Sequence, residues 1–171
     1  MNRIWIGVFV AVVCAVVLVS TSMVGQNNAA QEAKDRVEIE SLMWHYARAL
    51  DTGNGDAYAA TYTVDGQFGT GANATKGREA LKKLADRPAP QPTANGQAAP
   101  ARAPLYHMEA NTWIEFIDKN HADYHAYYIT ASGANGPNEP PRLAAAGRSV
   151  NHLERVNGKW LIKIRDVSPK D

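Results

Sequence analysis

The chain of 171 residues contains a single cysteine, Cys14, which lies inside an apolar N-terminal run. Disulfide bonds, thiol catalysis and cysteine-ligated metal sites are therefore excluded for the rest of the chain. The 18 basic and 17 acidic residues nearly cancel, and no basic stripe occurs, which argues against nucleic acid as a partner. The sequence also lacks a phosphate-binding loop and the HxH or HExxH spacing of metal sites, so we expect neither a metal nor another cofactor.

The N-terminus has the layout of a secretory signal. Arg3 precedes residues 4–19, which carry no charge and are mostly apolar, and small and polar residues follow. The run is slightly shorter than the ~17 to 25 residues of a membrane-spanning helix. We therefore expect export, to the periplasm or the medium, with residues 1–30 as signal and short linker. A retained N-terminal membrane anchor is the alternative, and it is the one case in which a membrane would be a partner.

Residues 31–171 have the length of one domain. Apolar spacing predicts a first helix over 31–50, and Gly53 and Asn54 suit a stop and a new helix cap. Residues 88–104 have the Pro- and Ala-rich composition of a mobile loop. The other predicted elements are helices over 55–63 and 77–87, a short strand over 64–71, and two hairpins, 105–118 with 121–131 and 146–156 with 159–167. This order predicts an α+β fold with three N-terminal helices packed on a strongly bent, mainly antiparallel sheet.

Strand register assigns the faces of the hairpins. A two-residue Asn157-Gly158 turn pairs Asn151 with Ile164 and places Arg165 on the polar face. The predicted core face then carries Leu153, Trp160, Ile162 and Ile164 together with Ser149, Asn151 and Asp166. In the first hairpin, pairing of Ile117 with Ala122 predicts one face that carries His107, Glu109, Asn111, Trp113, Tyr124 and Tyr128. Whether this face or the more apolar opposite face packs against the helices stays open.

Asp51 stands at the C-terminal end of the first predicted helix. A carboxylate there opposes the helix dipole, at a cost of a few tenths to ~1 kcal/mol. Two explanations remain open: Asp51 accepts hydrogen bonds from the turn that follows it, as aspartate often does at helix ends, or it is kept for a function.

Four segments resemble the SnoaL-like branch of the nuclear transport factor 2-like superfamily, over roughly Glu38 to Val167: IESLMWHYARALDTGNGDAYAATYTVDGQF, GREAL, YHMEANTWIEF and GRSVNHLERVNGKWLIKIRDV. The resemblance implies a cone-shaped fold with a pocket between helices and sheet, commonly in dimers. Members include polyketide cyclases, ketosteroid isomerase, limonene epoxide hydrolase and scytalone dehydratase. The dehydratase is the nearest in layout.

This resemblance implies a catalytic pair, Asp51 and His107, in which the imidazole acts as base or acid. The chain departs from the dehydratase at Leu50, Thr70 and Ala131, where that enzyme has two tyrosines and a second histidine, so its reaction does not transfer directly. The residues that we expect to bind substrate are Tyr46, Tyr62, Asn111, Trp113, Tyr124, Tyr128, Ser149 and Asn151.

The resemblance therefore implies a homodimeric, cofactor-free lyase or isomerase, and the aromatic residues of the predicted pocket favour a small hydrophobic cyclic substrate. A ligand-binding protein without catalysis and a purely structural dimer are the alternatives.

Overall fold

The computed structural model describes residues 28–87, 95–96, 103–134 and 140–170. The expected signal segment up to residue 27 and most of the expected loop over 88–104 lie outside the described residues. The chain divides into two compact units, Met1–Val37 and Glu38–Asp171. Within the described residues, no helix is long and apolar enough to cross a membrane. Everything below concerns the second unit.

The second unit opens with residues 38–52 of a helix that begins at residue 28. Gly53, with a φ of 66°, turns the chain out of this helix. Asn54 then caps α2 (Gly55–Ala60), its side-chain oxygen accepting from the Ala57 amide at 3.0 Å. Helix α2 is shorter than predicted because the Thr61 hydroxyl donates to the Tyr58 carbonyl at its end and strand β1 begins at once. After a single 3-10 turn, Gly71–Asn73, helix α3 covers Arg78–Ala85.

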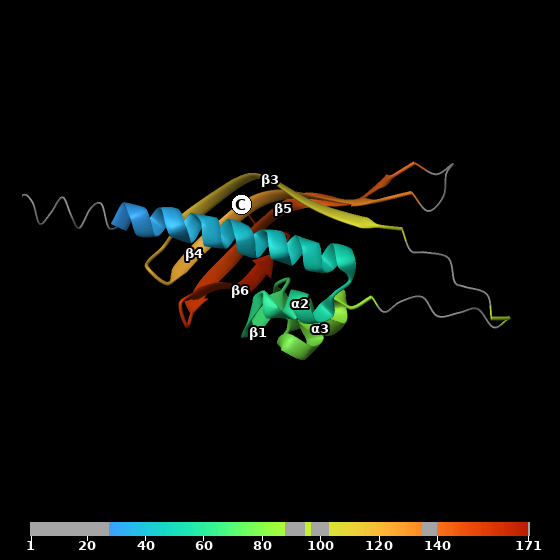
Figure 1. Ribbon diagram of the computed structural model, residues 1–171, viewed down its shortest axis with the longest axis horizontal. Coiled ribbons are helices and arrows are strands. Elements are labelled where there is room, and N and C mark those ends of the chain that lie inside the picture. The colour runs from blue at the N-terminus through green and yellow to red at the C-terminus, as the bar shows by residue number, and fades with distance from the viewer. Residues whose placement is uncertain (1–27, 88–94, 97–102, 135–139, 171) are drawn as a thin grey trace, which may run out of the picture. The chain divides into compact units, whose positions relative to one another are not determined.

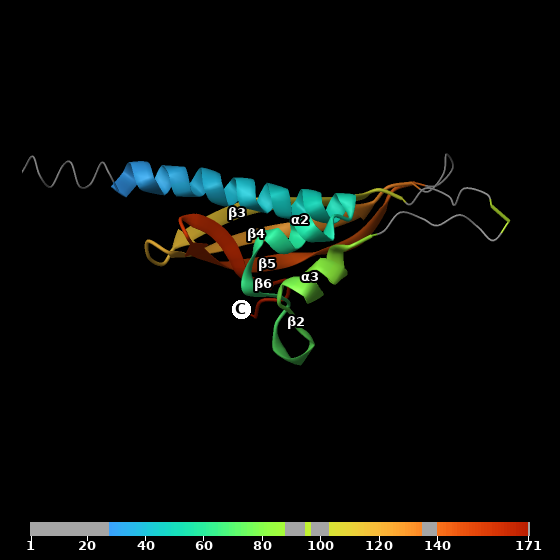
Figure 2. The same cartoon turned by 60° about the horizontal axis from the view of Figure 1, so that its bottom comes forward.

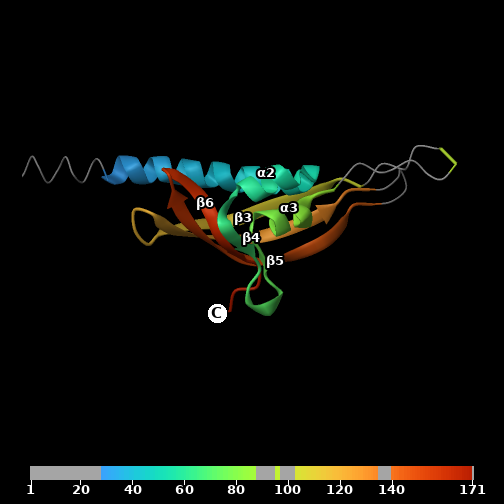
Figure 3. The ribbon, with the colours of Figure 1, turned by 90° about the horizontal axis from the view of Figure 1, so that it is seen from below.

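The sheet has six strands in the order β2-β1-β6-β5-β4-β3. Strand β1 runs parallel to β6, and all other neighbours are antiparallel. The bounds are β1 Tyr62–Phe68, β2 Thr75–Lys76, β3 Leu105–Phe116, β4 His121–Ser132, β5 Arg142–Val156 and β6 Lys159–Asp166. The predicted α+β class is confirmed, as a mixed sheet with three helices. Figures 1 to 3 show α2 and α3 on one side of this sheet, which curves around them.

The second hairpin follows the prediction only near its turn. Asn157 and Gly158 both have positive φ, and Leu153 pairs with Ile162 as expected. A β-bulge then adds one residue to β6, so Asn151 pairs with Arg165 and not with Ile164. Because side chains alternate along a strand, one extra residue reverses every face beyond it. The predicted core position of Ile164 and the predicted polar position of Arg165 are therefore wrong.

The first hairpin shows the same effect. Ala122 pairs with Phe116 and not with Ile117, and a bulge follows between Ala110 and Trp113. Asn111 takes a left-handed backbone there, with a φ of 50°. The bulge brings Ile114 and Phe116 to the same side as His107 and Glu109 and turns Asn111 and Trp113 outward. The prediction that Asn111 and Trp113 share the face of His107 is wrong for this reason.

The core lies between the helices and the inner face of the sheet. Its buried side chains come from the first helix, α2, α3 and the strands, and the fully buried ones include Ile39, Tyr58, Tyr62, Leu81 and Ile162. These contacts hold the helix end and the inner sheet face in fixed positions.

We predict that Ile162→Ala destabilises the fold by about 2 to 5 kcal/mol, because it leaves a cavity in a packed core. The measurement is the free energy of unfolding in denaturant. The matched control is Val64→Ala at a side chain that is 75% exposed, for which a change within about 0.5 kcal/mol is expected. Equal losses in both variants would contradict this placement of the core.

Candidate active site

Asp51 and His107 are in direct contact. The Asp51 Oδ1 atom lies 2.8 Å from His107 Nδ1 and also accepts a hydrogen bond of 2.9 Å from the backbone amide of His107. The two side chains are 14% and 22% exposed. Since the carboxylate engages Nδ1, the other ring nitrogen, Nε2, is the one left for a ligand. The helix-end carboxylate thus fixes both the backbone and the ring of His107.

Arg87 explains how the helix end tolerates this carboxylate. Its guanidinium Nη2 donates to the carbonyl oxygens of Leu50 and Asp51, each at 2.5 Å. The Arg87 amide also donates to the Gly53 carbonyl at 3.1 Å. Gly53 permits this approach, because a Cβ there would lie 2.6 Å from Arg87 Cβ. A cation at a helix C-terminus stabilises the dipole that Asp51 opposes. The sequence did not predict that Arg87 caps the first helix.

His107 lies on the wall of a cavity of about 320 Å³. The lining comprises apolar side chains and polar ones: Leu50, Phe68, Leu84, Ala145 and Val167, with Tyr46, Tyr58, His107, Tyr128, Thr130 and Arg165. A larger hollow of about 460 Å³ lies elsewhere, between the first helix and α2. We place the candidate site in the smaller cavity, because it alone of these two includes the histidine of the pair.

Three tyrosines pack together beside the cavity. The hydroxyls of Tyr58 and Tyr62 lie 2.8 Å apart, and the ring of Tyr46 lies 5.3 Å from that of Tyr58 and 6.2 Å from that of Tyr62. Burial raises the pKa of all three hydroxyls, so they stay protonated hydrogen-bond donors at neutral pH. Tyr46 was predicted and lines the cavity. Tyr62 was predicted as well, but it does not line the cavity. Tyr58 does line the cavity and was not predicted, although it lies in the helix that Asn54 caps.

The bulge in β6 brings a buried cation to the cavity. Arg165 is 5% exposed in its side chain, and its Nη1 lies 2.9 Å from Glu109 Oε1. The same nitrogen donates to Asn151 Oδ1 at 2.8 Å, and the guanidinium lies 4.5 Å from the Tyr46 ring. Burial alone would lower the pKa of Arg165, but its electrostatic partners, Glu109 among them, raise it above the usual range. Arg165 therefore remains charged beside His107.

The other predicted site residues divide between core and surface. Asn151 is fully buried, and its amide nitrogen donates to the Tyr124 carbonyl at 3.2 Å, so it supports Arg165 without lining the cavity. Ser149 and Tyr124 are likewise buried outside the lining. Tyr128 does line it, and its ring rests against Gly147, where a Cβ would lie 2.8 Å from the Tyr128 hydroxyl.

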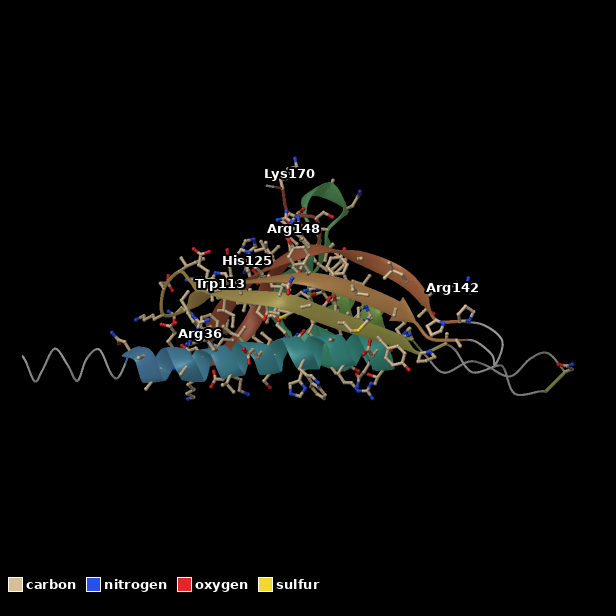
Figure 4. All side chains as sticks on the ribbon, turned by 90° about the horizontal axis from the view of Figure 1, so that it is seen from above. Arg36, Trp113, His125, Arg142, Arg148 and Lys170 are labelled. Atoms are coloured by element: carbon tan, nitrogen blue, oxygen red, sulfur yellow. The ribbon has the colours of Figure 1, made fainter. Side chains whose placement is uncertain are left out.

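On the outer side, Trp113 is 64% exposed, and Asn111 is exposed beside it. Neither residue lines the cavity of His107. Figure 4 shows Trp113 beside His125, its pairing partner on β4. The bulge in β3 is the physical reason, since it turns both side chains away from the helices.

Histidine–carboxylate contacts occur at other places too. His121 lies 2.9 Å from Asp118, and His152 lies 2.7 Å from Asp123, both near the surface. The pair of Asp51 and His107 differs because it borders a cavity and is mostly buried. In the described part of the chain, no group of three His, Cys, Asp or Glu side chains is placed to hold a metal ion.

We predict that Arg87→Ala destabilises the protein by about 1 to 2 kcal/mol, because it removes the cation that caps the first helix. Thermal or denaturant unfolding measures the change. Lys83→Ala, at an exposed position one turn earlier, is the control and should change stability by less than about 0.5 kcal/mol. A loss no greater for Arg87 than for Lys83 would argue against the capping role.

A family model described as the SnoaL-like domain matches residues 31–166. No curated protein matches the chain. A protein of unknown function from Mycobacterium tuberculosis superposes with a TM-score of 0.66 at 20% identity, over 83% of this chain and 75% of that chain. A provisionally assigned scytalone dehydratase from Novosphingobium aromaticivorans gives 0.62 at 20% identity, over 81% and 85%. ActVI-ORFA from Streptomyces coelicolor gives 0.63 at 18% identity, over 78% and 95%. At such identities these structures show a shared fold.

Proposed function

Because the chain belongs to the SnoaL-like family, within the nuclear transport factor 2-like fold, we propose that it is a cofactor-independent lyase or isomerase. The single observation that carries this proposal is the contact of 2.8 Å between Asp51 and His107 at the wall of a cavity. We further propose that this cavity is the mouth of the cone that the family fold implies. Polyketide cyclases and dehydratases of the same family support a reaction of this class.

In the proposed reaction, His107 Nε2 removes a proton from a carbon beside a carbonyl group. The electron pair of the broken C–H bond passes into an enolate. In a lyase the enolate expels a hydroxyl group from the next carbon, which leaves as water with the proton from His107. In an isomerase His107 returns the proton to a different carbon. Asp51 holds the ring in one tautomer and stabilises the imidazolium that forms.

The cavity lining favours a small cyclic substrate. Its volume of about 320 Å³ and its side chains Leu50, Phe68 and Leu84 suit an apolar ring system. The hydroxyls of Tyr46 and Tyr58 provide donors for substrate oxygens, and their raised pKa keeps them neutral. A binding protein that uses the same cavity without catalysis is the competing proposal.

We predict that His107→Ala lowers kcat by roughly a hundredfold to ten-thousandfold, the usual contribution of a general base. The substrate tested is hydroxytetralone, a cyclic β-hydroxy ketone that yields fluorescent naphthol on losing water. Asp51→Asn should reduce kcat as well, because it removes the charge that supports the imidazolium. His121→Ala is the matched control, since it removes an aspartate-paired histidine from the surface.

Ligand binding separates the two proposals. If naphthol binds to the wild-type protein and to His107→Ala alike while neither turns over any β-hydroxy ketone, the protein is a binding module. If naphthol does not bind at all, a structural role is left for the fold.

We also propose a homodimer that covers the outer face of the sheet. Five large apolar side chains are exposed on β3 and β4, namely Tyr106, Met108, Trp113, Tyr127 and Ile129. Strand pairing sets Met108 opposite Ile129 and Trp113 opposite His125, so these groups form one continuous surface. Contiguous apolar patches of this kind mark interaction sites, and a second copy of this chain is the occupant that the family resemblance favours.

We predict that Met108→Lys shifts the protein from dimer to monomer, because a charge would be buried in the interface. Light scattering coupled to size exclusion measures the molar mass. Val64→Lys is the control, since Val64 is 75% exposed on β1, at the other part of the sheet. A wild-type protein that is already monomeric would contradict the dimer without touching the catalytic proposal.

The apolar run after Arg3 supports a last proposal, that the protein is exported. N-terminal sequencing of the protein from the expressing cells and from their medium or periplasm decides between cleavage and a retained anchor.

A further inference from the structure

Arg165 is the buried charged group that the proposed reaction does not yet use. Its guanidinium lines the same cavity as His107 and is 5% exposed. Removing a guanidinium from water is unfavourable, and a buried ion pair is rarely more stabilising than apolar side chains of the same size. The ion pair with Glu109 therefore gives no stability reason for keeping a cation at this point of the core.

The placement of Arg165 depends on a specific backbone device. A regular ladder beyond Ile162 would have turned its side chain away from the cavity, as the sequence alone predicted. The added residue in β6 turns it inward instead, opposite Asn151. Asn151 and Glu109 then fix the guanidinium, and both of these contacts use Nη1. In the described part of the chain the buried Nε has no hydrogen-bond partner, and neither contact uses Nη2. The guanidinium therefore keeps donor capacity where Arg165 lines the cavity.

The charges around the cavity determine which kind of ligand oxygen the Arg165 guanidinium can bind. Glu109 already balances Arg165, and Asp51 adds a further carboxylate beside His107. Neither carboxylate lines the cavity, but Glu109 contacts Arg165 and Asp51 contacts His107, both of which do. Arg165 and Arg87 balance these two charges, so a ligand carboxylate would be repelled as a third, unbalanced negative charge. An uncharged carbonyl oxygen meets the same N–H donors without that repulsion, and the apolar lining suits the ring that carries it.

We propose that Arg165 binds the carbonyl oxygen of an uncharged cyclic ketone whose adjacent carbon faces His107. Asn151 and Glu109 are positioning residues that act through the guanidinium. This proposal rests on the proposed function, and it names the residue that binds the substrate oxygen in the same site. When His107 takes the proton, the C–H electron pair moves into the enolate, and the oxygen gains its negative charge beside a cation that is already in place.

The test compares naphthol, a stable analogue of a cyclic enol, with naphthalene, which has the same rings and no oxygen. Dissociation constants come from the fluorescence of the two probes. The wild-type protein should prefer naphthol by roughly tenfold or more, because a site built to bond an oxygen rejects the analogue that lacks it. The emission of bound naphthol should also shift toward that of naphtholate, since Arg165 favours the ionised form.

Arg165→Gln alone leaves Glu109 buried without its cation, so it is combined with Glu109→Gln to keep the fold. The double variant should lose most of the preference, to within about threefold, while still binding naphthalene. Glu109→Gln alone retains Arg165 and an acceptor oxygen for its Nη1, and should therefore keep more of the preference than the double variant does. Asn151→Ala should reduce the preference severalfold without weakening naphthalene, a difference that a merely structural role would not produce.

Each outcome separates this proposal from the catalytic one. His107→Ala should keep the preference for naphthol, because Arg165 is intact. If the preference is present but no ketone is turned over, the assignment of Arg165 stands and the proposed reaction fails. Equal binding of the two probes by the wild-type protein, binding of neither, or an unchanged preference in a folded double variant overturns the assignment.

Discussion

The carboxylate of Asp51 joins the end of the first helix to strand β3, and the candidate site depends on that junction. One oxygen accepts from both the amide and the ring of His107. The acceptor stands where the helix dipole disfavours it, and Arg87 offsets this by covering the adjacent carbonyls. The Asp51 side chain therefore joins the helix end to strand β3, and the Arg87 side chain joins the same helix end to the segment that follows α3.

Local sequence signals predicted a large part of this arrangement. Apolar spacing predicted the first helix, Asn54 predicted the cap of α2, and Asn157-Gly158 predicted the tight turn of the last hairpin. The contact between Asp51 and His107 came from a family resemblance, because no local pattern joins residues 56 positions apart. These features depend on interactions between residues close in the chain or on the order of helices and strands, and both can be recognised in the amino-acid sequence.

The strand faces could not be predicted in the same way. Arg165, Asn111 and Trp113 were each assigned to the wrong side of the sheet. Arg165 lies beyond a β-bulge and Asn111 lies within one, whereas Trp113 lies next to that bulge, where the pairing is already shifted by one residue at the turn. A bulge leaves little mark in the sequence, since its added residue is an ordinary lysine in β6 and an asparagine or threonine in β3. When the bulge is not recognised, the alternation of side chains is counted from the turn, and residues beyond the bulge are assigned to the wrong face of the sheet. Arg165 was missed because a charged residue in an amphipathic strand is ordinarily placed in solvent.

The added residue in β6 also affects how this chain should be compared with its relatives. A relative whose last strand has no bulge would be one residue shorter between the turn and the cavity. Aligned without a gap, its inward side chains would be set against the outward ones of this protein, and Arg165 would be matched to a solvent-facing position. Equivalent residues on this strand should therefore be assigned by superposing the backbones before residue identities are compared.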